Sequence, residues 1–190
     1  MKMVFNKYLE LEEVDLMRQW FYSRGHRKEY KKNDLFICEG GLSQSVGFVE
    51  FGSFRYLKWN DKSAYEQIVG YSFENDFVVD YGSLRTETRA LVSIQAMKDS
   101  VVWVLDNNLF DLFFDSLGEN DLRARFAELL FLDVYGRLMS FYIDSPTERY
   151  LKLIGRFPDI LELVSLKEIA SYIRVTPETL SRIRKKLISM

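Results

Sequence analysis

The side chains with the clearest potential chemistry lie between positions 176 and 186 of this 190-residue sequence. Hydroxyl, carboxylate, arginine and lysine groups recur there at helical spacing, beside an aliphatic set that a helix would hide. A helix that presents such polar groups near its N-terminus is suited to insertion into the DNA major groove. We therefore predict DNA contacts from Thr176, Pro177, Glu178, Thr179, Ser181, Arg182, Lys185 and Lys186.

Two short helices joined by a tight turn are expected to position these side chains. Ser165 can cap the first helix, with Glu168 three residues later to complete a capping box. Thr176 can cap the second, and Pro177 takes the first helical position, where its missing N–H costs nothing. The inward apolar residues are Leu166, Ile169, Ala170 and Ile173 in the first helix and Leu180, Ile183 and Leu187 in the second. An ordinary helical hairpin is the alternative interpretation.

The charge of the chain is divided unevenly, although its formal net charge is only −2. Residues 145–190 hold nine Lys and Arg against five Asp and Glu, a balance of +4 that leaves −6 for residues 1–144. This asymmetry indicates a small basic DNA-reading segment attached to an acidic sensor.

Composition argues against several classes of site. One cysteine, Cys38, and one histidine, His26, allow no internal disulfide and no four-cysteine zinc or iron–sulfur site, so no metal and no cofactor are expected. The apolar runs are too short to span a membrane, and the first residues lack the apolar core of a secretory signal. We expect a cytoplasmic protein with no membrane contact.

Catalysis is not expected from these residues. The single histidine has no evident partner, and the sequence offers no set of nucleophile, base and orienting group. Glu74, Asp76 and Asp80 could suggest a metal site, but acid clusters in loops are usually solvated.

The pattern of apolar residues changes along the chain from helical to β-like and back. Residues 1–25 are predicted to be helical. Residues 27–105 contain short β-like runs between turn signals, which indicates a β-sandwich or barrel. Helices are then predicted over 107–117, 119–143 and 145–157. The expected strands are 35–38, 46–51, 53–59, 65–71, 91–96 and 101–105.

The long helix predicted over 119–143 carries more apolar surface than packing on one small barrel requires. We predict that part of this surface pairs with a second copy in a parallel dimer. Packing of the whole surface against the chain's own sheet is the alternative. The residues predicted for the dimer helix are Leu122, Phe126, Leu130, Val134 and Leu138.

Two stretches together resemble the Crp/Fnr family of bacterial transcription regulators, named after the cyclic-AMP receptor protein. Residues 32–40 with 46–55 look like the paired, glycine-punctuated hairpins of a cyclic-nucleotide-binding barrel. Residues 169–187 look like the family's turn and recognition helix almost position by position. Of the two stretches, the second is the more specific match.

The resemblance implies an α+β fold with three parts. Residues 1–117 would form a cyclic-nucleotide-binding-type β-barrel, a double-stranded β-helix or jelly roll, with flanking helices. Residues 118–144 would form a dimerisation helix, and residues 145–190 a helix-turn-helix domain. That domain would lack the long wing of many relatives, because the sequence ends at Met190. The family's homodimers read near-palindromic sites in double-stranded DNA.

The family also implies roles for individual positions of the second helix. An acidic residue and an arginine reach base edges in the family, and Glu178 and Arg182 match them, four residues apart on one helix face. Arginine can make two hydrogen bonds to guanine, and a carboxylate can accept one from cytosine. The hydroxyl residues 176, 179 and 181 and the lysines 185 and 186 are placed for phosphate contacts.

The sequence departs from the family's cyclic-nucleotide binders at residues 71–90. The expected Gly-Glu pair is missing, and no hydroxyl residue stands between Arg89 and Ala90. Three acids lie near the place of the phosphate and oppose an anion. We therefore predict an unknown small effector other than cyclic AMP, or none. The pocket assigned to that effector comprises Glu74, Asp76, Arg85 and Arg89.

A second class of function stays open at this point. The chain could be a small-ligand-binding module whose helix-turn-helix contacts another protein instead of DNA.

Overall fold

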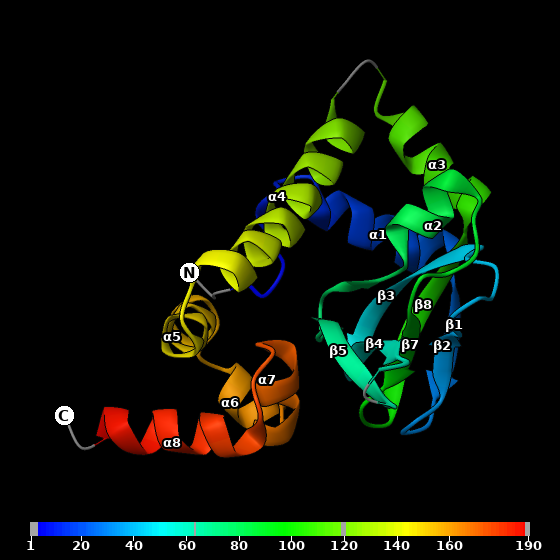
Figure 1. Ribbon diagram of the computed structural model, residues 1–190. Coiled ribbons are helices and arrows are strands. Elements are labelled where there is room, and N and C mark those ends of the chain that lie inside the picture. Colours follow the sequence, from blue (N-terminus) through cyan, green and yellow to red (C-terminus); the bar gives the residue numbers. More distant parts are fainter. Residues whose placement is uncertain (1–3, 63, 119–120, 189–190) are drawn as a thin grey trace. The chain divides into compact units, whose positions relative to one another are not determined.

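The computed structural model describes residues 4–62, 64–118 and 121–188, which form two compact units (Figure 1). The barrel unit comprises residues 6–129, and the helical unit comprises residues up to Phe5 together with those from Leu130 onward. The division falls within the long helix α4 (Leu122–Ile143), so this helix contributes to both units. The predicted three-part division into 1–117, 118–144 and 145–190 stays a prediction.

Two four-stranded antiparallel sheets make up the barrel unit, which confirms the predicted jelly-roll class. One sheet has the order β1-β8-β3-β6, formed by His26–Tyr30, Ser100–Asp106, Ser45–Phe51 and Phe77–Val78. The other has the order β2-β7-β4-β5, formed by Leu35–Ile37, Ser93–Ala96, Phe54–Asn60 and Tyr65–Ser72. Inward residues of both sheets form one core, including Val49, Phe54, Val78, Ile94, Ala96 and Val102.

Close approach of the strands explains two glycines. A Cβ at Gly47 in β3 would lie 2.5 Å from a methyl group of Val102 and 2.7 Å from one of Val78, so any side chain there would collide with the core. Gly52, in the turn between β3 and β4, has φ of +110°, and a Cβ there would meet the hydroxyl of Ser100.

The helix predicted over residues 1–25 is wrong as a continuous element. The described residues form a 3₁₀ helix, η1 (Lys7–Glu10), and then α1 (Val14–Arg24). Leu11 is extended between them, because the η1 segment turns inward to bury Tyr8. Tyr8 packs on Phe126 with ring centroids 4.5 Å apart. Long-range aromatic packing therefore overrides the local helical pattern.

Three short elements of the barrel unit were not predicted. The exposed residues of β1 are mostly charged, as is usual for a strand at the edge of a sheet, so the strand lacks an apolar signal. β6 has only two residues. Helix α2 (Tyr81–Thr86) has only six residues and is capped by Asp80, whose side chain accepts from Ser83 N. The predicted helix over 107–117 is confirmed as α3 (Asn107–Ser116).

The helical unit contains α5 (Pro146–Arg156), α6 (Ile160–Leu163), α7 (Leu166–Tyr172) and α8 (Pro177–Ile188). The predicted start of α5 is confirmed by a capping box between Ser145 and Glu148. Helix α6 was not predicted. The buried apolar residues of the unit form its core: Phe5, Tyr150, Leu153, Phe157, Ile160, Val164, Ile169, Ala170, Ile173, Leu180 and Ile183.

A buried carboxylate anchors η1 to the barrel. Asp76, between β5 and β6, is 1% exposed. Its carboxylate accepts hydrogen bonds from the Tyr8 hydroxyl at 2.6 Å, from the Asn6 amide at 2.7 Å and from Phe77 N at 2.7 Å. Burial raises the pKa of Asp76 from 3.8 to about 6, although these donors act in the opposite direction.

Replacing Asp76 with Asn is expected to alter how stability depends on pH. The raised pKa means that the folded chain holds the proton more tightly than the unfolded chain. The contribution of Asp76 to the free energy of unfolding is therefore most favourable below about pH 4. It falls as the pH rises to about 6 and is constant above that. The fall amounts to about 3 kcal/mol and should be absent from denaturant unfolding of Asp76→Asn.

Glu74→Gln is the matched control, because Glu74 lies on the exposed side of the same turn. Its stability should follow the wild-type pH profile. Parallel profiles for wild type and Asp76→Asn between pH 4 and 8 would contradict the assignment.

Candidate nucleic-acid interface

Helices α7 and α8 form the predicted pair, and both start signals operate as expected. Ser165 Oγ accepts from Glu168 N at 3.3 Å, and the Glu168 carboxylate accepts from Ser165 N at 3.3 Å, so the capping box is confirmed. Thr176 Oγ1 accepts from Thr179 N at 3.2 Å at the start of α8. Two of the orphan donors at the helix N-termini are therefore satisfied by the residues that the sequence indicated.

A tight turn of residues 173–176 joins the two helices. Arg174 adopts the left-handed conformation with φ of +56°, which reverses the chain within a few residues. Val175 N then donates to Ala170 O at 2.9 Å. Ala170 is fully buried, so its small side chain permits the close crossing of α7 and α8. Leu180 and Ile183 complete the contact from α8.

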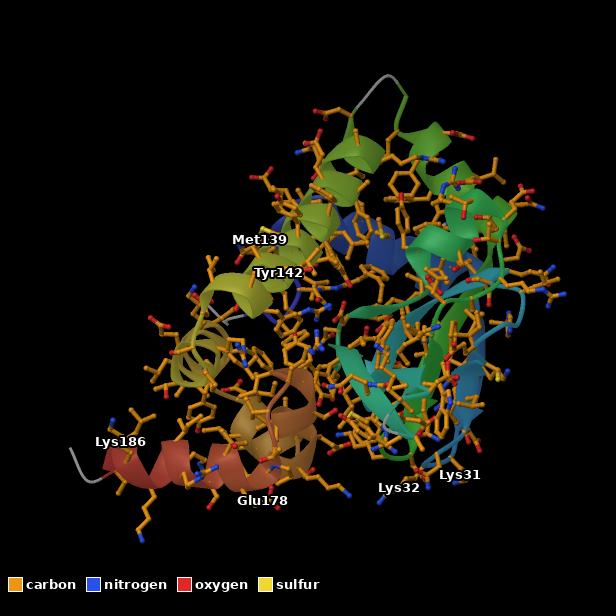
Figure 2. All side chains as sticks on the ribbon, in the orientation of Figure 1. Lys31, Lys32, Met139, Tyr142, Glu178 and Lys186 are labelled. Carbon is orange, nitrogen blue, oxygen red and sulfur yellow. The ribbon has the colours of Figure 1, made fainter. Side chains whose placement is uncertain are left out.

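The residues predicted to contact DNA lie together on α8 and at its start. Seven of the eight are exposed and Thr179 is half-buried. Glu178 and Lys186 lie toward opposite ends of the helix (Figure 2). Their roles in binding DNA stay predictions. The exposed set is Thr176, Pro177, Glu178, Ser181, Arg182, Lys185 and Lys186.

The start of α8 also favours the ionised form of Glu178. Its own backbone N–H and the Thr176 hydroxyl lower the pKa of Glu178, and Arg182 acts in the same direction. The guanidinium of Arg182 donates to the Thr179 hydroxyl at 3.3 Å, on the exposed surface of the helix. The face therefore presents one carboxylate and one guanidinium, side by side, to a ligand outside.

Within the described residues of the barrel unit, the four side chains predicted for an effector pocket have no hydrogen-bond or ion-pair partner in common. Glu74 is exposed, whereas Asp76 is buried against Asn6 and Tyr8. Arg85 forms an ion pair with Asp111 at 2.6 Å, and Arg89 donates to Gly40 O at 2.8 Å. Within the described parts of the chain, no hydrogen bond or ion pair joins any two of these four residues.

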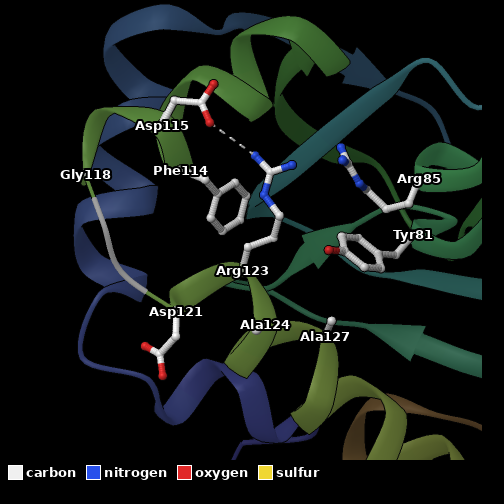
Figure 3. Close-up of a pocket in the computed structure, with 9 residues that line it drawn as sticks. All are labelled: Tyr81, Arg85, Phe114, Asp115, Gly118, Asp121, Arg123, Ala124 and Ala127. Atoms are coloured by element: carbon white, nitrogen blue, oxygen red, sulfur yellow. Dashed lines mark ion pairs between the residues drawn. The ribbon is translucent and has the colours of Figure 1, made fainter.

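A cavity of about 620 Å³ lies among α2, the end of α3 and the start of α4 (Figure 3). Of the four predicted effector residues, only Arg85 lines it. Arg123 stacks over Phe114 at 4.7 Å and pairs with Asp111 at 2.9 Å and Asp115 at 3.8 Å. Asp111 thus binds both Arg85 and Arg123, an interaction that the sequence did not indicate. The lining residues are Tyr81, Arg85, Phe114, Asp115, Gly118, Asp121, Arg123, Ala124 and Ala127.

The face of α4 that was predicted to form a dimer differs in part from the face left exposed. Leu122 and Phe126 are 1% and 2% exposed, because the barrel unit buries them, so neither can line a dimer contact. Leu130 is half-buried, whereas Val134 and Leu138 are exposed. The exposed large apolar residues further along the helix are Phe131, Leu132, Val134, Tyr135, Leu138, Tyr142 and Ile143. Residues 122 and 126 of the predicted set are therefore corrected to core residues.

Neither His26 nor Cys38 belongs to a cluster of metal-binding side chains. Both residues are exposed. Across residues 4–62, 64–118 and 121–188, no group of three His, Cys, Asp or Glu side chains could hold a metal ion. Within the same ranges, no helix has the length and apolar character needed to cross a membrane.

Comparison with known proteins matches the barrel to a domain family and the chain to solved structures with a similar fold. Residues 27–116 match the family model of the cyclic nucleotide-binding domain. FixK2 of Bradyrhizobium japonicum aligns with a TM-score of 0.71 and 16% identity over 87% of this chain and 85% of its own. A mutant of CooA from Carboxydothermus hydrogenoformans aligns with a TM-score of 0.70 and 16% identity, over all of this chain and 87% of its own.

A third solved structure extends the likeness. The c-di-GMP-responsive global regulator CLP of Xanthomonas campestris aligns with a TM-score of 0.67 and 17% identity over 92% of both chains. No curated protein sequence matches this chain significantly. At these identities the solved structures establish a shared fold.

Removing the cap of α8 should destabilise the helical unit. Thr176→Ala leaves the Thr179 N–H without its side-chain acceptor and should lower the free energy of unfolding by about 1 kcal/mol. Thr176→Ser retains a hydroxyl at the cap and should lose much less. Denaturant unfolding monitored by circular dichroism makes the comparison, and equal losses in both variants would show that the cap contributes nothing.

Proposed function

We propose that this chain, which has a cyclic nucleotide-binding domain and the fold of the Crp/Fnr regulators, is a sequence-specific DNA-binding transcription regulator. The observation that carries the proposal is the exposed face of α8. That face holds a carboxylate, a guanidinium, hydroxyl groups and lysines on a helix whose aliphatic side is buried against α7. The three structural neighbours support the fold on which the proposal rests.

In this proposal Glu178 and Arg182 are the residues that contact base edges. They project from one face of α8, one turn apart, and both are exposed. The guanidinium can donate twice to a guanine, and the carboxylate can accept from a cytosine amino group. Thr176, Thr179 and Ser181 set the register through phosphates, as do Lys185 and Lys186, so binding should weaken steeply with salt.

The protein acts as a homodimer through the exposed seam of α4. The seam consists of Phe131, Tyr135, Leu138 and Tyr142, which are 61%, 46%, 45% and 77% exposed. Their spacing of four, three and four residues is that of a coiled-coil contact stripe. The rings of Phe131 and Tyr135 stack at 5.4 Å and form one apolar surface. A two-fold axis would place two α8 helices in successive major grooves about 34 Å apart, on a near-palindromic site.

The barrel senses a small effector without the contacts used by the family's cyclic-AMP binders. Asp111 already holds Arg85, and a backbone carbonyl already accepts from Arg89, so neither guanidinium faces a phosphate without competition. Asp76 is occupied in the core by Tyr8 and Asn6. The CLP neighbour is c-di-GMP-responsive, which supports a sensing role for a barrel of this fold without identifying the ligand here.

Arg182→Ala should lose sequence discrimination rather than all binding. Selection from a random duplex pool, followed by fluorescence anisotropy at several salt concentrations, should give a two-fold-symmetric site with the wild type. The variant should lose about 1–3 kcal/mol of discrimination at one base pair of each half-site. Lys186→Ala should weaken binding to all sequences and reduce the salt slope by about 1 per subunit.

Lys62→Ala is the charge-matched control, because Lys62 is an exposed lysine of the barrel unit. It should bind as the wild type does. A folded, dimeric wild type that enriches no site at any salt concentration would contradict DNA reading and favour protein contact through α8.

Leu138→Glu should dissociate the dimer. The change places one carboxylate from each copy in an apolar seam, and we expect the dissociation constant to rise by more than about tenfold. Sedimentation equilibrium measures it, and circular dichroism checks that helix content is retained. Leu16→Glu is the control, because Leu16 on α1 is similarly exposed, at 49%. An unchanged monomer–dimer equilibrium in Leu138→Glu would exclude this seam.

A further inference from the structure

Arg149 lies at the junction of three helices in the helical unit. It belongs to the first turns of α5, close to the end of α4 and to the turn between α7 and α8. Its Nη1 donates to Asp144 O at 2.8 Å, and its Nε donates to Ile173 O at 2.9 Å. Its Nη2 lies 3.5 Å from Arg174 O, at the limit of hydrogen bonding. One side chain thus reaches the backbone after α4 and the backbone after α7.

The carbonyl groups of Asp144 and Ile173 lie just past the ends of α4 and α7, where a side-chain donor can satisfy them. The last carbonyls of a helix have no partner within that helix. Asp144 follows the last residue of α4, and Ile173 is the C-cap of α7. A guanidinium carries five N–H donors in a rigid plane, so one arginine can serve several carbonyls at once. Lysine has neither this plane nor the reach of two separate donor edges.

An aromatic contact reinforces the same junction. The ring of Phe141 on α4 lies 5.9 Å from the guanidinium carbon of Arg149 and 5.4 Å from that of Arg174. Arg174 is the left-handed residue of the turn that leads into α8. The turn is therefore held to α4 by hydrogen bonds through Arg149 and by cation–π contact with Phe141.

We infer that Arg149 is a positioning residue that fixes the angle between α4 and α8. The inference rests on the proposed function for its biological meaning, because the dimer helix and the reading helix are the two elements joined. Helix α8 has twelve residues and is about 18 Å long, so a small rotation at its first turn displaces its far end by several ångströms. Arg149 would then select the spacing of the two half-sites without touching DNA.

A second contact explains why losing Arg149 should loosen α8 rather than release the whole unit. Arg137 on α4 donates to the Tyr172 hydroxyl at 2.8 Å and stacks over its ring at 5.0 Å. Tyr172 is the last residue of α7. Helix α7 thus keeps its own attachment to α4, and α8 stays packed on α7 and α5, whereas Arg149 and Phe141 tie the turn before α8 directly to α4.

Double electron–electron resonance, which measures the distance between two spin labels, tests the inference directly on the full chain without DNA. Spin labels would be placed at Gly136→Cys on α4, where a side chain meets open space, and at Ile188→Cys near the end of α8, where the residue is exposed. Cys38→Ser removes the native thiol, and excess unlabelled chain isolates distances within one subunit. Arg149→Met and Arg149→Lys should each broaden or shift the distance distribution relative to Arg149.

Ser165→Ala is the matched control for lost stability. It removes the capping box of α7 in the same unit but leaves the α4 junction untouched. A stabilising residue without a positioning role would change the distance distribution no more than this control does. Distributions for Arg149→Met and Arg149→Lys that coincide with those of the wild type or of Ser165→Ala would overturn the inference.

Operators with altered spacing test the consequence for DNA reading. Inserting one base pair between half-sites rotates one relative to the other by about 35°. The unlabelled wild type should discriminate strongly against the insertion, and Arg149→Met should lose at least about tenfold of that discrimination while keeping its base preferences within each half-site. Unchanged discrimination in Arg149→Met would overturn the spacing role.

The two experiments fail independently. If wild type binds no DNA, the proposed function fails, whereas the distance measurement still decides whether Arg149 sets the angle.

Discussion

The burial of Phe126 and Leu122 is the constraint on which the packing of α4 in the barrel unit depends. Once these two residues of α4 enter the core of the barrel unit, the rotation of the helix about its axis is set. From Leu130 onward the helix belongs to the helical unit, where its 3.6-residue period separates packed residues from exposed ones. Phe141 and Arg137 contact groups of the helical unit, and Phe131, Tyr135 and Leu138 are left exposed. One helix therefore has a part buried in the barrel unit, a part packed in the helical unit and an exposed apolar seam.

Helix α8 depends on satisfied backbone groups at the start of α7 and on both sides of the turn that joins α7 to α8. Ser165 and Thr176 supply acceptors at the two helix starts, and Arg149 supplies donors at the end of α7. These polar contacts are local and directional, whereas Ala170 and Leu180 provide the apolar contact that holds the pair together. A few hydrogen bonds around a small apolar core thus hold α8 in the helical unit.

Ion pairs in the barrel unit oppose a simple nucleotide pocket. Asp111 engages both Arg85 and Arg123, and Arg123 is also stacked on Phe114. A ligand phosphate would have to compete with a carboxylate already in place. The barrel unit therefore matches a cyclic nucleotide-binding domain, but Arg85 and Arg123 are already paired with Asp111.

The residue pattern alone predicted a β-sandwich or barrel, the long helix and the two capped helices with their exposed residues, and the family resemblance narrowed the β class to a jelly roll. These features depend on periodicity, turn residues and caps, which act over a few neighbouring positions. The sequence did not predict β1, because an exposed edge strand has no apolar pattern, nor the break between η1 and α1, because Tyr8 is drawn to Phe126. The sequence analysis assigned Asp76 to an effector pocket and Leu122 and Phe126 to a dimer contact. Only the tertiary structure showed that all three side chains are buried. No sequence motif indicated the contacts of Arg149, because its partners are backbone carbonyls up to 25 residues away. The sequence alone determined the local chemistry. The tertiary structure established which side chains are buried in the core and which stay exposed and available for function.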